Sequence, residues 1–299
     1  MDLRHLRHFL AVAETLNYTR AAERLMMAAS PLSRSIQQLE SELGGPLFAR
    51  GTRKVELTTL GQALIPHAER TLADVDRLER EMRRRVLGHP EFRVGMRSVP
   101  AEVIDAVVDD VIRRVEPDAM IGLEPLDSFP QMDQILNGRL ALGILNRRVD
   151  DTRLDYIPIL LEQVGIALPD RPEYSGLTEV LPEHLAELRL LVQQGLEPFG
   201  PEVKEYRDAA TDIVHVTTDI IGGLPTLISH GDSCCLTMVN PLAPWHRYLA
   251  GDGVIIRPLP AAFPKGTTYL AWRVDRDAPD DLGPVLSVAR ARFASPLDR

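Results

Sequence analysis

The chain is poor in cysteine and has no long apolar run. Its two cysteines, Cys234 and Cys235, are adjacent, which is the spacing of neither a metal site nor an ordinary disulfide. We expect both to be buried in a strand, with redox sensing as the alternative. No run approaches the roughly 20 apolar residues of a membrane span, and the N-terminus has no signal core. We therefore expect a cytoplasmic protein without a membrane partner.

The motifs that usually carry catalysis or bind cofactors are also missing. There is no P-loop, no dinucleotide-binding glycine pattern and no zinc-ligand spacing. His230, Asp232, Ser233 and Cys234 lie close in sequence, but such proximity is not the mutual geometry that a nucleophile and its base need. We expect neither an enzyme nor a bound cofactor or metal.

Acidic residues outnumber basic ones, but unevenly along the chain. The 299 residues carry a formal net charge of −9. Residues 1–89 hold 14 Lys and Arg against 11 Asp and Glu, while residues 90–299 hold 20 against 32. The acidic charge of the longer part therefore does not exclude a nucleic-acid partner for the first 89 residues.

Near the N-terminus, apolar residues recur at helical spacing. The pattern predicts a helix over residues 3–14, a short helix over about 19–26 with Thr19 as its N-cap, and a third helix that Ser30 caps. The third helix would bury Leu32, Ile36, Leu39 and Leu43. Its outward face is polar and lightly charged, which suits a recognition helix in a major groove.

Two short strands around a basic turn are predicted next, over residues 46–57, which completes a winged helix-turn-helix. Thr58 then caps a helix to about Leu87, roughly 45 Å long. Along this linker helix, residues at alternating steps of four and three have the spacing of a two-helix seam: Leu64, Ala68, Thr71, Val75, Leu78 and Met82. We expect the helix to make the protein a dimer.

The residues expected to contact DNA lie in the second and third helices and in the wing. Those of the wing would meet the phosphate backbone or the minor groove, with an affinity that falls as salt rises. The full set is Thr19, Arg20, Ser30, Pro31, Ser33, Arg34, Gln37, Arg50, Arg53 and Lys54.

From residue 91 onward, short apolar strands alternate with helices. Strands are predicted at 92–96, 120–126, 140–145, 154–161, 163–168, 188–192, 213–216, 234–239, 254–258 and 269–274. Helices are predicted at 101–115, 131–137, 181–187, 201–209, 219–230, 241–249 and 280–293. This order indicates mostly parallel sheets with helices on their faces, in two α/β lobes with a cleft lined by loops at the strand ends.

Loops after these strands supply the candidate residues of a small-molecule site. They are Ser98, Val99, Pro100, Ser128, Phe129, Asn146, Arg147, Gln193, Thr217 and Thr218. Arg147 is the most natural counter-ion for an anionic metabolite. For each position the alternative is a plain capping or solvated residue.

Two parts of the sequence resemble LysR-type transcriptional regulators. The runs LRHLRHFLAVAETLNYTRAAERL, SPLSRSIQQLESELGGPLFAR and VELTTLG are similar to that family's N-terminal signature across residues 2–61. The later part is similar more loosely, through the phrases LNGRL and ILLEQVGIALPDRP. The resemblance implies a winged helix-turn-helix domain (1–58), a dimerising linker helix (59–89) and a two-lobed α/β effector domain like type 2 periplasmic binding proteins (90–299). Lobe one would be about 91–162 with 268–299, and lobe two about 163–267.

The resemblance also implies a function. Members bind an inverted repeat in double-stranded DNA, usually as tetramers, and change DNA bending when a small molecule enters the interlobe cleft. They often activate a neighbouring operon, which makes RNA polymerase a partner, and repress their own gene. The chain departs from the family at Ala29, where glutamine is usual, and at Ala141, where aspartate is common. The first change moves base reading toward Ser30, Pro31, Ser33, Arg34 and Gln37.

Two other classes of function compete with this hypothesis. A solute-binding protein for transport could have two such lobes, but the N-terminal winged helix argues against it. An architectural DNA-binding protein without a ligand would not need a further two-lobed part of about 200 residues with a net negative charge. We therefore expect a regulator that senses a small molecule.

Overall fold

The computed structural model describes residues 2–50, 55–87, 90–193, 201–216, 223–251, 253–275 and 282–299. The chain forms two compact units, one of residues 1–89 with 137–139 and one of residues 90–136 with 140–299. Within the described ranges, no helix is long and apolar enough to cross a membrane, and no cluster of three or more His, Cys, Asp or Glu side chains could hold a metal ion.

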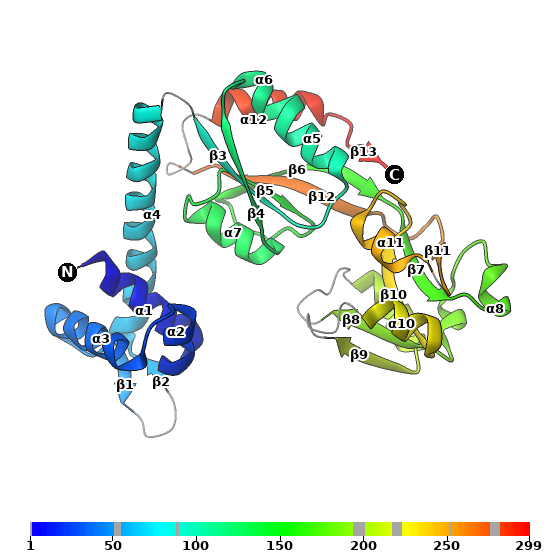
Figure 1. Ribbon diagram of the computed structural model, residues 1–299, viewed down its shortest axis with the longest axis horizontal. Coiled ribbons are helices and arrows are strands. Elements are labelled where there is room, and N and C mark those ends of the chain that lie inside the picture. The colour runs from blue at the N-terminus through cyan, green and yellow to red at the C-terminus, as the bar shows by residue number, and fades with distance from the viewer. Residues whose placement is uncertain are drawn as a thin grey trace. The chain divides into compact units, whose positions relative to one another are not determined.

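The first unit contains a three-helix bundle, a two-stranded wing and a long helix (Figure 1). Its elements are α1 (Leu3–Thr15), α2 (Tyr18–Arg24), α3 (Ala29–Leu43), β1 (Phe48–Arg50), β2 (Val55–Leu57) and α4 (Thr59–Leu87). Strands β1 and β2 pair antiparallel, and the hydroxyl of Thr58 accepts the N–H of Gly61 at 3.0 Å as α4 begins. The wing, the Thr58 cap and the length of α4 agree with the sequence prediction.

The predicted cap of α2 was wrong. Asn17, not Thr19, caps this helix, because its side-chain oxygen accepts the N–H groups of Thr19 at 2.9 Å and Arg20 at 3.1 Å. Asn17 has extended backbone angles (φ −155°), which place its side chain over the first free N–H groups. Asparagine is at least as good a cap as threonine, and here it comes two residues earlier.

The predicted cap of α3 was also wrong. The helix begins at Ala29, with Ala28 in the N-cap position and no side-chain cap, so Ser30 lies inside the first turn. The start of the helix is instead fixed by packing, because Leu32 and Ile36 are fully enclosed in the core of the bundle.

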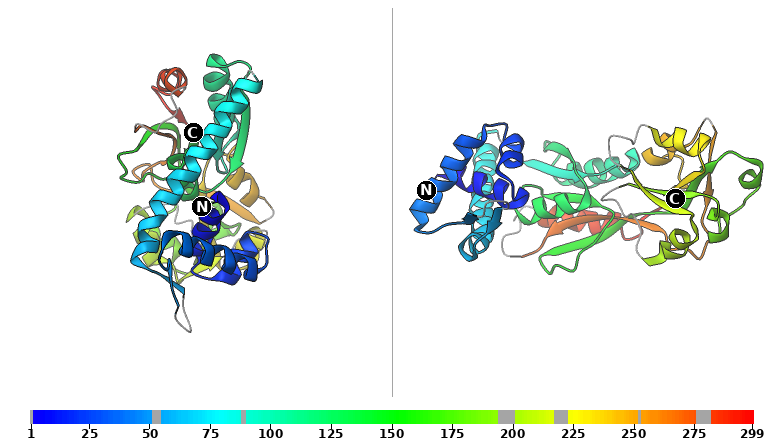
Figure 2. Two further views of the ribbon diagram at one scale, coloured as in Figure 1. Left: turned by 90° about the vertical axis from the view of Figure 1, so that its left-hand side faces the viewer. Right: turned by 90° about the horizontal axis from the view of Figure 1, so that it is seen from below.

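Part of the predicted seam on α4 belongs to the first unit itself. Ala68 is 1% exposed and lies with Leu72 in the core that Phe9 and Leu39 also form, and Leu64 packs against that core. The prediction that Leu64 and Ala68 face a second chain was therefore wrong. Further along α4, Leu78, Met82 and Val86 are exposed, Leu78 at 57% and Val86 at 83%. Figure 2 shows the uninterrupted length of α4.

The second unit contains two sheets, the first of six strands in the order β13-β6-β12-β5-β3-β4. Its strands are β3 (Glu91–Met96), β4 (Met120–Pro125), β5 (Leu142–Leu145), β6 (Leu154–Glu162), β12 (Gly266–Arg273) and β13 (Leu297–Asp298). On one face lie α12 (Leu282–Arg292) and a continuous helical stretch of α5 (Ala101–Val107), π-helical η1 (Val108–Ile112) and α6 (Arg113–Val115). Helix α7 (Ser128–Leu136) covers the other face.

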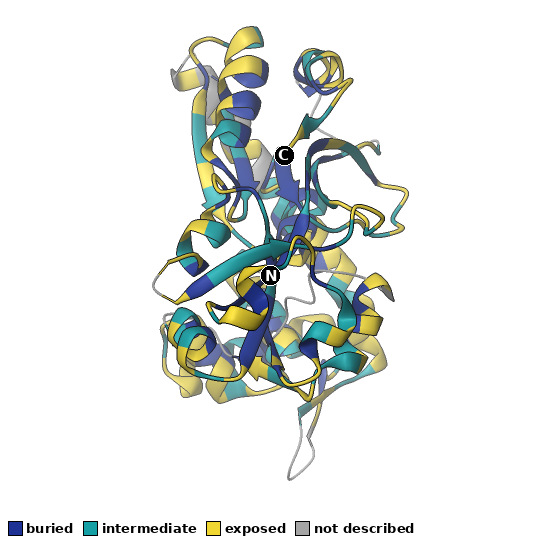
Figure 3. Cartoon of the chain, turned by 90° about the vertical axis from the view of Figure 1, so that its right-hand side faces the viewer, coloured by how far each residue is buried: buried dark blue, intermediate teal, exposed yellow. Residues whose placement is uncertain are grey.

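The second sheet has five strands in the order β11-β7-β10-β8-β9. They are β7 (Val164–Pro169), β8 (Arg189–Gln193), β9 (Asp212–Val216), β10 (Ser233–Met238) and β11 (Val254–Pro258). One face is covered by α8 (Pro172–Ser175), η2 (Pro182–Leu185), η3 (Pro201–Val203) and α9 (Lys204–Ala209), and the other by α10 (Leu224–His230) and α11 (Pro244–Leu249). The buried strands and the exposed outer sides of the helices are visible in Figure 3.

Both sheets are mostly parallel, as the sequence predicted, but each contains one strand that runs in the opposite direction. Strand β12 runs antiparallel to β5 and β6, and β7 runs antiparallel to β10 and β11. The chain passes from the first sheet to the second between β6 and β7, and returns between β11 and β12. The strand that returns is inserted in the middle of the first sheet in the opposite direction. Among the described residues, the hydrogen-bonded neighbours that run parallel are β5-β3-β4, β10-β8-β9 and the short β6-β13 pair.

Candidate DNA interface and effector site

Helix α3 presents a polar face that its own core-facing side holds in place. Ser30, Pro31, Arg34 and Gln37 are exposed, and Ser33 is half-buried. The guanidinium of Arg34 donates to the hydroxyl of Ser30 at 3.2 Å, one turn earlier in the helix. Arg34 is thus the cation on this face that could donate two parallel hydrogen bonds to a base edge.

Side-chain hydrogen bonds connect helix α3 to α1 and to the start of the wing. Near the middle, His8 on α1 shares a 2.7 Å hydrogen bond with the hydroxyl of Ser35. Burial is the main cause that lowers the pKa of His8, which favours the neutral ring in this contact. Toward its end, the carboxylate of Glu40 accepts the N–H groups of Leu47 and Phe48, at 2.8 and 3.3 Å, where the wing begins. The recognition helix and the base of the wing therefore form one rigid surface.

The other predicted DNA contacts lie in α2 and the wing. Thr19 and Arg20 are exposed in the first turn of α2. Arg50 lies in β1, but its side chain, together with Arg53 and Lys54, lies outside the described residues.

The first sheet brings three of the predicted effector loops to one edge. Strand β3 is parallel to both β4 and β5, and the N–H of Leu126 donates to the carbonyl of Met96 at 2.9 Å just beyond the strands. Because parallel strands end at the same edge, the residues after Met96, Pro125 and Leu145 lie side by side. Strand β6 also ends at this edge, since β12 is antiparallel to both β5 and β6.

Two of the predicted residues are in direct contact at this edge. Ser128 is the first residue of α7, not a loop residue, and only 4% of it is exposed. Its hydroxyl donates to the side-chain oxygen of Asn146 at 2.8 Å and accepts the Asn146 N–H at 3.2 Å. Phe129 is half exposed, and the guanidinium of Arg147 lies 5.7 Å from the centre of its ring. Ser128 and Asn146 thus hold the loop that presents Arg147.

The remaining predicted positions differ in their suitability for a ligand. Ser98 is exposed, but Val99 and Pro100 are buried, and Val99 is part of the core beneath α5. The side chain of Val99 is therefore committed to the core, so Ser98 is the exposed residue of this loop. The side chain of Gln193 and the whole of Thr217 and Thr218 lie outside the described residues.

Arg97 is a candidate that sequence reasoning missed. Its Nε atom is buried without a hydrogen-bond partner in the described part of the chain, and so is the Nη2 atom of Arg147. Burial is the main cause that lowers the pKa of Arg97; Asp127 and Glu162 oppose this shift, and Arg147 adds to it. The position could have been found by the criterion that selected Ser98, because Arg97 also directly follows a strand.

A buried carboxyl lies where β6 ends at the same edge. Glu162 is 6% exposed, and its Oε1 atom accepts the side-chain N–H of Asn240 at 2.9 Å. Asn240 follows β10 of the second sheet, so this hydrogen bond joins the two lobes. Burial raises the pKa of Glu162.

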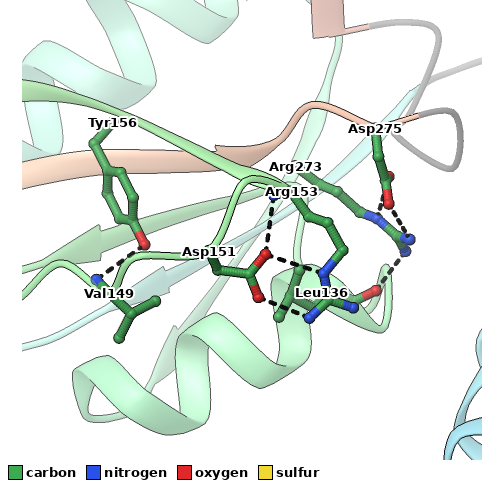
Figure 4. Close-up of polar contacts among 7 residues, drawn as sticks. All are labelled: Leu136, Val149, Asp151, Arg153, Tyr156, Arg273 and Asp275. Carbon is green, nitrogen blue, oxygen red and sulfur yellow. Dashed lines mark hydrogen bonds and ion pairs between the residues drawn. The ribbon is translucent and has the colours of Figure 1, made fainter.

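The loop that carries Arg147 continues to β6 through a set of local contacts (Figure 4). Tyr156 accepts the N–H of Val149 at 3.4 Å, and Asp151 accepts both the N–H and the guanidinium of Arg153. The guanidinium of Arg148 lies 5.5 Å from the ring centre of Tyr156. These contacts hold the loop from both sides, so Arg147 extends from a fixed backbone.

The groups that could have suggested catalysis or redox sensing are unsuited to it. Cys234 and Cys235 are buried in β10 as expected, and burial raises the pKa of both thiols, that of Cys235 to about 12. A thiol in this state is a poor nucleophile and a poor redox sensor. Ser233 is fully buried in the same strand, whereas His230 instead contacts the hydroxyl of Ser229 at 2.7 Å.

Comparison with known protein families identifies the family to which the chain belongs. Residues 3–62 match the model of the bacterial regulatory helix-turn-helix protein, lysR family, and residues 89–294 match the LysR substrate binding domain. The chain belongs to the LysR family of transcriptional regulators. This LysR-type regulator is thus a DNA-binding protein with an effector-binding domain, and it is not an enzyme.

Relatives and solved structures agree with the family. The HTH-type transcriptional regulator IlvR of Caulobacter vibrioides is 43% identical over 292 residues, covering 93% of this chain and 94% of IlvR. The Hca operon transcriptional activator HcaR of Escherichia coli K12 is 28% identical over 302 residues, 99% of each protein. The crystal structure of CbnR, a LysR family transcriptional regulator, shares the fold with a TM-score of 0.63 at 20% identity, covering 98% of this chain and 99% of CbnR.

Proposed function

We propose that this LysR-type regulator binds a dyad operator as a dimer or tetramer and responds to a small anionic effector. The winged helix-turn-helix would be residues 1–58, the linker helix 59–89 and the effector domain 90–299. It would act in the cytoplasm, where its DNA is. The observation that carries the effector proposal is the buried Nη2 atom of Arg147, which has no hydrogen-bond partner among the described residues and lies at the edge where three parallel strands end.

The DNA-binding part of the proposal rests on the exposed face of α3. Ser30, Arg34 and Gln37 are exposed on one side of a helix whose other side is fully buried, so the polar side chains are available and their positions are fixed. Ala29, where the family most often has glutamine, offers no hydrogen bond. Base reading therefore depends on Arg34 and Gln37, while Thr19, Arg20 and the wing residues Arg50, Arg53 and Lys54 contact phosphates.

The self-association part of the proposal rests on α4. Leu78, Met82 and Val86 leave apolar surface exposed on a helix whose first turns are already used by the core. A second copy of α4 would cover this surface, and two recognition helices would then read the two halves of the dyad. The relative HcaR is described as an operon activator, which supports activation through RNA polymerase for this chain as well.

The test is a footprint of the full-length protein on DNA upstream of its own gene at physiological salt. A protected dyad is expected, and Arg34→Ala should weaken it by about 1–3 kcal/mol, about tenfold to a hundredfold. Arg113→Ala is the matched control, because Arg113 is an exposed arginine at the start of α6 that pairs with Asp109 of η1. Absence of any specific footprint would refute operator binding. A footprint that no anion alters would favour a ligand-independent architectural protein.

A further inference from the structure

At the effector site, two half-buried arginines each have one buried guanidinium nitrogen without an acceptor among the described residues. The Nε atom of Arg97 and the Nη2 atom of Arg147 have no hydrogen-bond partner among the residues that the structure describes. A buried N–H of a charged group that has lost water and gained no acceptor is unfavourable. Both atoms are therefore available to donate to an acceptor that the described part of the polypeptide does not provide.

The two arginines come from neighbouring strands and act on one another. In the parallel register of β3 and β5, Val94 is opposite Leu142 and Gly95 is opposite Gly143. Arg97 therefore falls beside the end of β5, two residues before Arg147. The charge of Arg147 lowers the pKa of Arg97, so the two cations are close enough to repel. Added negative charge would relieve this repulsion.

The nearby carboxylates in the described part of the chain form no ion pair with Arg97 or Arg147. Asp127 and Glu162 favour the charged form of Arg97, but neither forms an ion pair with it in the described ranges. One oxygen of Glu162 already accepts from Asn240. Among the described residues, no carboxylate forms an ion pair with either guanidinium, so a ligand could supply the negative charge.

We propose that the effector carries two negative charges, one accepting from Arg97 and the other from Arg147. This inference rests on the proposed function and names the ligand class: a small dianion, either a dicarboxylate or a phosphate. Two guanidiniums, each with one buried nitrogen that lacks an acceptor among the described residues, are matched by two anionic groups, and a single carboxylate leaves one of them without an anionic partner. The exposed ring of Phe129 beside Arg147 offers an apolar surface for the carbon skeleton of the ligand.

The experiment measures ligand affinity of the full-length protein by calorimetric titration and thermal shift at constant ionic strength and neutral pH. The dicarboxylates malonate, succinate and glutarate and the dianion of inorganic phosphate are compared with butyrate, which has the carbon count of succinate and one charge. At least one dianion should bind and raise the melting temperature at concentrations where butyrate does not. Success of the dicarboxylates or of phosphate alone identifies the source of the two charges.

Variants separate the two arginines from general anion binding. Arg97→Gln should weaken dianion binding about tenfold to a hundredfold and abolish the preference over butyrate. Arg97→Lys keeps the charge but not the planar donor, so it should keep the preference at lower affinity, and it serves if the glutamine variant fails to fold. Arg113→Gln should bind the dianion as the wild type does, because Arg113 lies on the surface of α6.

The results that would contradict the two-charge proposal can be told apart from those that would contradict the proposed function. Equal binding of butyrate and every dianion, or an Arg97→Gln variant that keeps the preference, would overturn the two-charge proposal while leaving an anionic effector. If none of the anions bound at all while the operator footprint persisted, the two-charge proposal and the anionic effector would both fall, and operator binding would stand.

Discussion

At the scale of single residues, the fold changes the protonation equilibrium of Glu162. It is buried at the end of β6, where the chain is about to enter the second lobe, and it accepts a hydrogen bond from Asn240 of that lobe. Burial raises its pKa above the ordinary 4.5, Asn240 and Arg97 act against this shift, and Glu102 adds to it. Glu102 is itself paired with Arg299 at 2.9 Å.

This shift predicts how stability depends on pH. A carboxyl with a raised pKa in the folded state binds its proton more tightly there than in the unfolded chain. Its contribution to stability is therefore complete below the ordinary pKa and is lost as pH rises through the raised value. Glu162→Gln removes the ionisation but keeps an acceptor for Asn240, so the stability of the variant relative to the wild type should increase as pH rises above the ordinary pKa of 4.5.

The check on Glu162 is denaturant unfolding of both proteins across that pH range. Glu202→Gln, at an exposed position on η3, is the matched control and should show a difference from wild type that does not vary with pH. A constant difference for Glu162→Gln as well would mean that the carboxyl is not the titrating group.

At the scale of helices and strands, periodic patterns gave reliable predictions and long-range features did not. The apolar stripes of α1, α3 and α4 predicted these helices because every turn repeats the same burial requirement. The direction of β12 was missed because strand pairing depends on a chain that returns from another lobe more than 100 residues later. The caps of α2 and α3 were missed because each helix has two candidate start residues that are two positions apart. They are Asn17 and Thr19 for α2, and Ala28 and Ser30 for α3.

The candidate site was predicted in part for the same reason. Arg147, Ser128 and Asn146 could be selected because they follow predicted strands. Arg97 met that criterion too, but only the fold shows that its Nε atom is buried without an acceptor. The burial of Val99 likewise depends on α5 packing over the sheet, which no local pattern records.

The exposed part of α4 predicts how the protein self-associates. Leu78 and Met82 are large apolar side chains in water, and burial against a second copy would contribute about 1.5–3 kcal/mol for each side chain. Leu78→Glu with Met82→Glu should therefore raise the dimer dissociation constant at least about a hundredfold. Sedimentation at micromolar concentration should show monomers of the variant where the wild type is dimeric.

The control for this substitution lies on the same helix. Glu79 is exposed next to Leu78, and Glu79→Gln should leave the oligomeric state unchanged. A wild-type protein that sediments as a monomer would refute the role of α4, and so would a double variant that remains fully dimeric.

At the scale of the whole molecule, charge and packing divide the chain in the same place. Residues 1–89 carry a positive balance and residues 90–299 a negative one, which suits a DNA-binding part attached to a sensing part that DNA repels. The first unit has its own core of helix and wing residues, and the second has separate cores around its two sheets. Each unit therefore has the apolar burial that it needs to fold independently.

Independent cores predict separate unfolding transitions in scanning calorimetry. Leu39 and Leu142 are both fully buried leucines, the first in the core of the DNA-binding unit and the second in the core of the six-stranded sheet. Each leucine-to-alanine change should cost about 2–5 kcal/mol through lost burial and a cavity. Leu39→Ala should lower only the transition of the first unit, and Leu142→Ala only that of the second. If both variants instead lowered one shared transition, the two units would unfold as a single cooperative structure, and the effector domain could then influence the recognition helix through stability as well as geometry.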